Sequence, residues 1–415
     1  MIRRIVTVNL IMMILFTSIV ILIEIAPTVT APSTFYVGGT GGGNYSKIQW
    51  AIENASHGDT IYVYNGTYYE NVVVNKRIDL IGENSETTII DGNGSKDVVN
   101  ITYNWVKVSE FTIRSSGDDT MDSGIILRNV LNCVISNNTL YHNRFGIHLY
   151  GSDSNTITNN TIYNNYMSIL LYSSNNNNVI DNIASYSDYG LYFSYSTDNL
   201  VINNTAQWNN ESGISIISNS VLNTFEYNSA CHNSRDGFYF WHASYNTLCW
   251  NNASYNSGRG LYFMTSSNNT VQNNTALKND CGLIFWASSD FNDIQHNHAV
   301  FNTGDGINIR NCENNTVKYN HASNNEGDGI LLWSSYYNTF ECNMVMNNIR
   351  RGIYFHSSAH NNEFKYNSIS GNERGVYIWY GDRNNFTFNN IFLNRDYGIY
   401  LEVAENNSLW NNNII

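Results

Sequence analysis

The sequence predicts an all-β fold: a single-stranded right-handed parallel β-helix, a solenoid of about thirteen coils of 22–24 residues. Three observations predict it. A small residue recurs every 22–24 residues, apolar residues alternate with a period of two after each one, and two columns of Asn repeat with the same spacing. Nothing after Pro32 interrupts a continuous β ladder on proline grounds.

The recurring small residue sets the phase of the repeat. Its members are Gly124, Gly146, Ser168, Gly190, Gly213, Gly237, Gly260, Gly282, Gly306, Gly329, Gly352, Gly375 and Gly398. Counting from this position 0, positions +1 and +3 are apolar, as in Leu191 and Phe193, which predicts a strand. Shorter strands are predicted around +11 (Val201) and +16 (Ala206). Three short strands without a helix indicate a parallel β-helix rather than a leucine-rich or βαβ repeat.

The polar positions repeat with the same phase. Asn occupies position +14 (for example Asn138, Asn160, Asn182, Asn274) and position +9 (for example Asn155, Asn177, Asn199, Asn269). Asn tolerates left-handed corners, and stacked amides can bond from coil to coil about 4.8 Å apart. We expect these columns, and a small-residue column at +6 (Ser174, Ser196, Ser266, Ser288, Ser335, Ser358), to be structural corner ladders.

The two ends of the solenoid are expected to differ. Residues 34–123 are predicted to form an N-terminal cap and irregular first coils, and residues 124–415 the regular coils. Ser46 and Gln49 form a capping-box pattern, and Ile48, Ala51, Ile52 and Ala55 make one apolar helix face that would cover the open core. No such cap follows Gly398, so we expect either that the chain is truncated there or that the C-terminal coil meets a protein partner.

Residues 1–33 are predicted to be a signal peptide or an N-terminal membrane anchor, because Arg3 and Arg4 precede a long apolar run. Either places the body outside the cytoplasm, as a secreted, periplasmic or cell-surface protein that touches a membrane only through this segment. Fifteen Asn-x-Ser/Thr sequons, among them Asn137, Asn159 and Asn203, agree with a glycosylated surface protein. The net charge of −13 argues against a nucleic-acid partner.

Several short motifs resemble one family. They are Tyr36-Val-Gly-Gly, Ala51-Ile-Glu-Asn-Ala, Gly58-Asp-Thr-Ile-Tyr-Val, Asn65-Gly-Thr-Tyr-Tyr-Glu, Leu80-Ile-Gly, Ile90-Asp-Gly and the repeated Gly-Ile-x-Leu coil. Over residues 34–415 the chain resembles NosD-type right-handed parallel β-helix repeat proteins, which include a periplasmic copper-binding protein and related carbohydrate-binding and sugar-hydrolysis domains. The resemblance implies the fold; because this fold hosts binders and enzymes alike, it leaves the function open.

An aromatic face is the first candidate site. Positions +2 and +4 of the first strand should point away from the core, since +1 and +3 point inward. The candidate ligand-binding residues there are Tyr239, Trp241, Tyr262, Trp286, Trp333, Tyr354, Tyr377 and Trp379. Exposed rings in such a stripe favour binding of a polysaccharide or cell-surface glycan. Ring ladders that only stabilise the sheet, or a protein-assembly surface, are the alternatives.

Charged residues before the Gly column are the second candidate. Asp280, Asp305 and Asp328 lie on successive coils and could bind Ca²⁺, with Arg351 or Arg374 as a base or a partner for a uronate. This arrangement resembles that of β-helix polysaccharide lyases. The chain has no lyase, galacturonidase or epimerase signature, however, and salt bridges along solvated turns explain the residues equally well, so catalysis is not favoured.

A cluster of soft metal ligands is the third candidate. His298, His321 and Met344 should stack in register in the column that elsewhere holds Thr, with His296 and Cys342 nearby on the same face. Imidazole, thiolate and thioether together suit copper. The six Cys occupy different positions in their coils, which argues against a disulfide framework.

Three functions therefore remain open: a glycan-binding or structural surface module, a NosD-like copper-binding accessory protein for metalloenzyme maturation, and a polysaccharide lyase or other carbohydrate-active enzyme.

Overall fold

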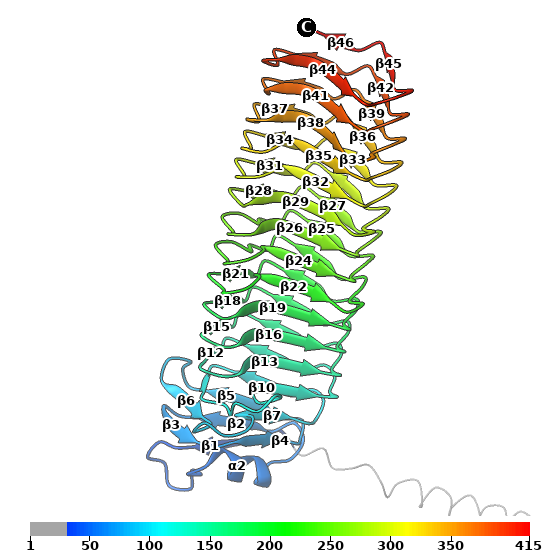
Figure 1. Cartoon of the computed structure of the whole chain (residues 1–415). Coiled ribbons are helices and arrows are strands. Elements are labelled where there is room, and N and C mark those ends of the chain that lie inside the picture. The colour runs from blue at the N-terminus through cyan, green and yellow to red at the C-terminus, as the bar shows by residue number, and fades with distance from the viewer. Residues whose placement is uncertain (1–30) are drawn as a thin grey trace, which may run out of the picture. The chain divides into compact units, whose positions relative to one another are not determined.

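The computed structural model describes residues 31–415, so the predicted export segment lies, up to residue 30, outside the described residues. Residues Thr34–Ile415 form one unit, the right-handed parallel β-helix that the sequence predicts (Figure 1). None of the helices found in residues 31–415 is long and apolar enough to cross a membrane.

The strands form three parallel faces, here called sheets A, B and C. Sheet A contains β1 Thr34–Val37, β2 Thr60–Val63, β5 Asp79–Gly82, β8 Lys107–Ser109, β11 Val134–Ser136, β14 Thr156–Thr158, β17 Asn178–Ile180, β20 Leu200–Ile202, β23 Thr224–Glu226, β25 Thr247–Cys249, β27 Thr270–Gln272, β30 Asp293–Gln295, β33 Thr316–Lys318, β36 Thr339–Glu341, β39 Glu363–Lys365, β42 Asn385–Thr387 and β45 Ser408–Trp410.

Sheet B is interrupted in two coils, where single bridges at Ser229 and Asn252 replace strands. Its first part contains β3 Gly66–Tyr69, β6 Thr88–Asp91, β9 Thr112–Arg114, β12 Thr139–Tyr141, β15 Thr161–Tyr163, β18 Ile183–Ser185 and β21 Thr205–Gln207. Its second part contains β28 Thr275–Leu277, β31 His298–Val300, β34 His321–Ser323, β37 Met344–Met346, β40 Ser368–Ser370, β43 Asn390–Phe392 and β46 Asn413–Ile414.

Sheet C carries the predicted aromatic face. Its strands are β4 Val72–Val74, β7 Val99–Ile101, β10 Ser123–Arg128, β13 Phe145–Tyr150, β16 Met167–Tyr172, β19 Tyr189–Ser194, β22 Ile214–Ile217, β24 Phe238–Trp241, β26 Arg259–Met264, β29 Cys281–Trp286, β32 Ile307–Arg310, β35 Ile330–Trp333, β38 Arg351–His356, β41 Arg374–Trp379 and β44 Tyr397–Glu402. Identical coil positions pair from strand to strand, for example Tyr239 with Tyr262.

The predicted inward positions are buried. Leu191 and Phe193 of sheet C and Ala206 of sheet B are fully buried. Rings stack inside the core, as in Phe263 and Phe285, whose centroids lie 4.6 Å apart. The Gly column marks the close corner between sheets B and C, where a Cβ at Gly282 would lie 2.4 Å from the Gly306 carbonyl oxygen.

The predicted Asn ladders are present. The Nδ2 group of Asn274 donates to Oδ1 of Asn297 on the next coil, over 3.0 Å, and to the Leu248 carbonyl oxygen. The +9 column bonds in the same way, as from Asn155 to Asn177. A third ladder stands at +19 and was not predicted from the sequence. It includes Asn279, whose Nδ2 group donates to Oδ1 of Asn302 on the next coil. These buried amides bond each corner of one coil to the next.

One feature of the ladder prediction is wrong. The left-handed residue at the +14 corner is the one before the ladder Asn: Asn159 has φ 55° and Asp181 has φ 57°. These residues are mostly exposed, whereas Asn160 and Asn182 are 1% exposed. The bonded position must face inward to reach the next coil, so the strained turn falls on its neighbour.

Two members of the predicted +6 column are also wrong. Ser288 and Ser358 are exposed left-handed turn residues, and the buried column continues through Ser289 and Ala359. The backbone N–H of Ser266 donates to Oγ of Ser289, over 3.1 Å. These coils have two successive left-handed residues in this turn, which moves the buried position by one.

The helix α2, Ile48–Asn54, contacts the first coils, where it lies against β1, β2 and β4 (Figure 1). Ile48, Ala51, Ile52 and Ala55 are buried, as predicted. The predicted capping box is wrong, because Lys47 is the N-cap residue and it makes no side-chain cap.

The cap comes instead from another coil. The Glu70 carboxylate accepts the backbone N–H groups of Ile48 and Gln49 at 2.9 and 3.1 Å. At the other end, Leu401, Leu409 and Ile414 stand at core positions but are 40%, 42% and 49% exposed. A protein partner on this coil stays a prediction.

Candidate functional site

The outer face of sheet C carries three columns of side chains. Position −1 holds acids and arginines in the C-terminal half, position +2 holds mostly Tyr or aliphatic residues, and position +4 holds Trp on alternate coils. The −1 column includes Asp236, Arg259, Cys281, Asp305, Asp328, Arg351 and Arg374, and the pairing confirms their register, for example Arg259 with Cys281. The predicted charged turn and aromatic face are therefore one continuous surface.

Two units on this surface share one design. Asp328 accepts from Nε and Nη2 of Arg351 at 2.7 and 3.1 Å, and the Arg351 guanidinium lies 3.5 Å from the ring centre of Tyr354. Asp236 binds Arg259 at 3.2 Å, and that guanidinium lies 4.1 Å from the centre of the Tyr262 ring. Each arginine thus joins an acid of the preceding coil to a tyrosine of its own coil.

These units correct the predicted aromatic face. Tyr262 and Tyr354 were expected to be exposed at +2, yet they are only 4% and 9% exposed because arginines cover them. Tyr239 and Tyr377 are half-buried. The rings of Tyr262 and Tyr354 are therefore not part of the exposed aromatic surface, which agrees with the alternative hypothesis that rings of this column stabilise the sheet.

The tryptophans at position +4, in contrast, are exposed to solvent. Trp241, Trp286 and Trp333 are 39%, 39% and 37% exposed, and Trp379 is partly exposed. Met264, Arg310 and His356 occupy the same position on the coils between them. The Trp333 ring stacks on His356 with centroids 4.1 Å apart, and Arg310 lies over it at 5.2 Å. The exposed aromatic surface is thus one tryptophan on every second coil.

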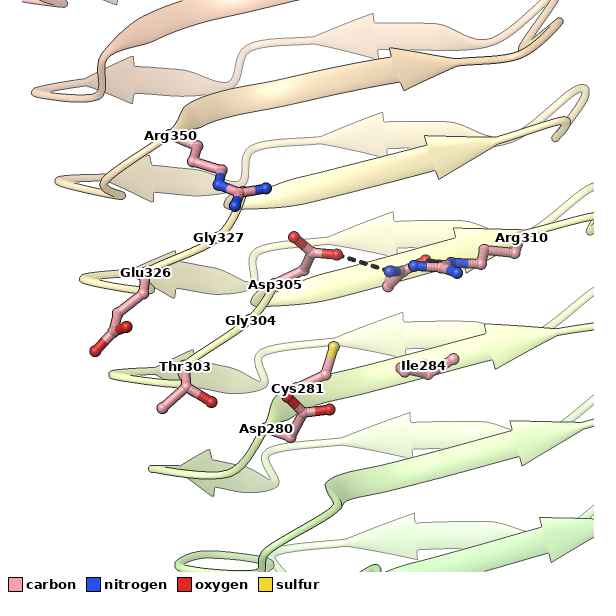
Figure 2. A pocket seen from close by; sticks show the side chains of 11 residues that line it. Asp280, Cys281, Ile284, Thr303, Gly304, Asp305, Arg310, Glu326, Gly327 and Arg350 are labelled. Carbon is pink, nitrogen blue, oxygen red and sulfur yellow. Dashed lines mark hydrogen bonds between the residues drawn. The ribbon is translucent and has the colours of Figure 1, made fainter.

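A cavity of about 300 Å³ lies beside this column (Figure 2). It is open because Gly304 and Gly327 stand in the turns before position −1, where Figure 2 shows bare backbone. Asp305 accepts from Nδ2 of Asn308 at 2.7 Å, and Oδ1 of Asn308 accepts from Nε of Arg310 at 2.8 Å. The chain of bonds fixes Arg310 beside the cavity.

A second cavity of about 400 Å³ continues along the same face. Its lining includes Tyr262, Ile284, Trp286 and two arginines, Arg259 and Arg310. The two hollows share Asp280, Ile284 and Arg310 and thus form one shallow groove over β26, β29 and β32, which Trp286 of the tryptophan column lines. Arg310 was not among the predicted site residues, because it stands at position +4, where the aromatic pattern drew attention to Trp on the neighbouring coils.

The candidate catalytic residues mostly have structural partners. Asp328 is bound by Arg351, and Oδ1 of Asp305 accepts the backbone N–H of Asp328 at 2.9 Å. Burial raises the pKa of Asp305, and it raises that of Asp328 to about 6 despite Arg351. Arg374 lies 3.8 Å from Asp396. Asp280 lines both cavities, and its carboxylate makes no hydrogen bond or ion pair with another side chain among residues 31–415.

Neither predicted metal site forms a cluster of three His, Cys, Asp or Glu ligands. Within residues 31–415, no three His, Cys, Asp or Glu side chains group closely enough to hold a metal ion. The carboxylates of Asp280, Asp305 and Asp328, predicted to share Ca²⁺, do not converge.

The soft ligands lie in two separate columns. His298, His321 and Met344 pair in register, as predicted. The His298 and His321 rings lie 5.5 Å apart, and Nε2 of His321 is buried without a hydrogen-bond partner among residues 31–415. His296 and Cys342 instead occupy the left-handed corner before the ladder Asn, where His296 stacks on Tyr319 at 4.9 Å.

The sequons lie mostly on corners. In residues 124–415 their acceptor Asn residues fall on the turns and on sheets A and B, never on a sheet C strand. Asn137, Asn159 and Asn203 are exposed left-handed corner residues, whereas the second Asn of each Asn-Asn-Thr is a buried ladder residue. Glycans on these acceptors would leave the groove accessible.

Comparison with known proteins identifies the family. Residues 190–345, 284–391 and 334–415, together more than half of the chain, match the family described as "Right handed beta helix region". Residues 52–253 match the family described as "Periplasmic copper-binding protein (NosD)". A cell surface glycoprotein of Methanothermus fervidus is 35% identical over 98 residues, which are 23% of this chain and 16% of that protein.

Solved structures agree on the fold alone. The catalytic unit of a GH87 α-1,3-glucanase from Streptomyces thermodiastaticus has a TM-score of 0.50 at 14% identity, over 93% of this chain and 71% of that one. A DFA-IIIase mutant from Arthrobacter chlorophenolicus has a TM-score of 0.48 at 11% identity, over 74% and 94%. The chain belongs to the right-handed β-helix family, with coils of the NosD type in its N-terminal half.

Proposed function

We propose that this protein is an extracytoplasmic, cell-surface β-helix that binds glycan chains along the outer face of sheet C. The apolar run after Arg3 and Arg4 and the match to a cell surface glycoprotein support the location. The groove supports the ligand class, because exposed indoles beside arginine and carboxylate groups offer both stacking surfaces and hydrogen bonds to sugars.

The spacing of the tryptophans carries this proposal. Trp241, Trp286, Trp333 and Trp379 occupy one column on every second coil. Since adjacent parallel strands lie about 4.8 Å apart, these rings repeat every ~10 Å along the solenoid axis. An extended glycan with two sugar residues per such interval would place alternate sugars over successive indoles. A ring ladder that only stabilises the sheet needs a ring on every coil, and of the coils between the tryptophans only that of His356 supplies one, whereas Met264 and Arg310 stand on the others.

The test compares tryptophans on and off the face. The purified protein is applied to an array of neutral and acidic glycans, then re-examined as Trp286→Ala, Trp333→Ala and the double variant. Trp250→Ala is the matched control, because Trp250 is 56% exposed but lies on the opposite corner. We expect each single variant to weaken retention about tenfold and the control to behave as wild type. Equal retention by the double variant and the wild type would overturn the proposal.

Copper binding at sheet B is the second candidate function. One observation favours it: His298, His321 and Met344 stack on three adjacent coils, with Nε2 of His321 buried and unpartnered. Two imidazoles and a thioether are ligands that suit Cu(I). His298, His321 and Met344 would hold the ion, in a site from which it can be transferred to an acceptor protein.

The copper test uses the residues of neighbouring coils. His298→Thr with His321→Thr restores the Thr that stands at this position in Thr275. We expect Cu(I) titration to show binding that this double variant loses and that His296→Asn, in the neighbouring corner column, retains. Absence of binding in the wild type, or equal binding by the double variant, excludes the site.

A further inference from the structure

A third cavity, of about 490 Å³, lies on sheet C near its N-terminal end. Phe145, Met167 and Leu170 form a small apolar cluster there, separate from the solenoid core. The segment between β9 and β10 contributes Thr120 and Met121 to the lining. The cavity is therefore bounded by the sheet on one side and by this segment on the other.

The lining changes in character with depth. His148 and Leu170 are 1% and 8% exposed, whereas Tyr150 and Tyr172 are 36% and 38% exposed. The two tyrosine rings stack nearly parallel, with centroids 5.6 Å apart at 7°. The cavity thus combines a buried imidazole with an accessible aromatic pair that belongs to the +4 column.

The hydrogen bonds around His148 indicate which of its ring nitrogens is without a partner. The Ser123 hydroxyl donates to the Met121 carbonyl oxygen at 3.0 Å. With its proton used in this way, the hydroxyl oxygen is assigned as the acceptor of Nδ1–H of His148, which lies 3.5 Å away. The proton then sits on Nδ1, and Nε2 carries a free lone pair. Nε2 is buried and has no partner among residues 31–415.

A buried acceptor without a hydrogen bond destabilises the folded protein, and the fold does not require such an acceptor at this position. The same position holds Ile126 and Leu170 on the neighbouring coils, and both are buried. An aliphatic side chain would fill the space without an unsatisfied nitrogen. Burial, with a smaller effect of Arg128, lowers the pKa of His148 to about 4, so the ring stays neutral at ordinary pH.

We propose that this cavity binds a sugar residue of a neutral glycan, with a sugar hydroxyl donating to Nε2 of His148 and the ring packing on Tyr150 and Tyr172. A hydroxyl is the donor that the free lone pair needs. No Asp, Glu, Lys or Arg side chain is among the seven residues that line the cavity, so nothing compensates a charged ligand. This proposal rests on the proposed glycan-binding function and names a separate subsite at the N-terminal end of the same face.

Saturation-transfer NMR on the full-length protein tests the subsite with monosaccharides, which are too short to span two tryptophans. The probes are methyl glycosides of glucose, galactose and mannose, with methyl glucuronide as the charged comparison. We expect transfer to at least one neutral glycoside and none to the glucuronide. His148→Leu, which copies Leu170, should abolish that transfer while the variant stays folded. Trp250→Ala, an exposed tryptophan outside sheet C, should leave it unchanged.

Nitrogen-15 spectra of the histidines supply a second readout. Binding of the neutral glycoside should move the Nε2 resonance of His148 in the direction of an acceptor that gains a hydrogen bond. Transfer that survives in His148→Leu, or no transfer to any neutral glycoside, overturns the subsite. Either result leaves the Trp286 and Trp333 retention assay to decide the proposed function, so the two failures are distinguishable.

Discussion

Arg351 lies over the ring of Tyr354, with its guanidinium carbon 3.5 Å from the ring centre, while two of its nitrogens bind Asp328 on the preceding coil. The acid is 4% and the arginine side chain 16% exposed. A charge pair buried to this extent stabilises the coil stack only while both partners are present.

Asp328→Ala tests this unit. It leaves the Arg351 guanidinium without its partner, so we expect the free energy of unfolding to fall by about 3 kcal/mol. Chemical denaturation measures the change. Glu363→Ala, which breaks the exposed Lys365–Glu363 pair, is the control and should cost less than about 1 kcal/mol. Equal effects of the two variants would show that the buried unit contributes no more than a surface pair.

The ladder prediction concerns two adjacent asparagines. Asn274→Asp removes the donations to Leu248 and Asn297 and places a carboxylate beside their oxygens, so we expect a loss of at least about 3 kcal/mol in unfolding free energy. Asn273→Asp should change the unfolding free energy by less than about 0.5 kcal/mol, because Asp181 stands at the equivalent left-handed corner of another coil. Thermal and urea unfolding of both variants distinguish the positions, and similar losses would refute the assignment.

The N-terminal cap gives a prediction that reverses the expectation from the sequence. Glu70→Ala removes the acceptor of the Ile48 and Gln49 N–H groups, and should lower the unfolding free energy by about 1 kcal/mol. Ser46→Ala should have no measurable effect, since the capping hydrogen bonds of α2 go to Glu70 and not to Ser46. A larger loss in Ser46→Ala than in Glu70→Ala would restore the capping box.

His148 predicts an acid sensitivity. Its pKa is about 4 in the folded protein and about 6.5 in an unfolded chain. As the pH falls from 6.5 towards 4, the unfolded chain takes up a proton that the folded protein does not, so stability is lost, by about 3 kcal/mol at pH 4. Above pH 6.5 this residue has no effect on the pH dependence.

His148→Leu removes that difference. Unfolding free energies of the wild type and the variant, measured from pH 7 to pH 4, should diverge in favour of the variant as the pH falls. Parallel pH curves for the two proteins would mean that His148 takes up its proton over the same pH range in the folded and the unfolded state.

The fold was predictable because its determinants repeat in every coil. The Gly position, the inward pair such as Leu191 and Phe193, and the ladder Asn each recur with one phase, so many coils support one assignment. Ser288 shows where this reasoning fails, since one extra turn residue in a coil shifts the phase locally.

The site was less predictable because it depends on contacts between coils. The exposure of Tyr262 is set by Arg259, and the orientation of Arg259 is set by Asp236 one coil earlier. Periodicity gives the face on which Tyr262 lies but not what covers it. The cap by Glu70 and the free nitrogen of His148 likewise arise from residues at least 20 positions apart, which no local pattern records.

The most direct test of glycan binding along sheet C is a crystal structure of the protein with the oligosaccharide that the array retains best. If glycans bind along sheet C, the crystal will show a sugar chain that runs along the solenoid axis, with alternate rings over Trp286 and Trp333 and with Arg310 between them. A glycan bound on the outer face of sheet A or sheet B, with the tryptophan column uncovered, would contradict it.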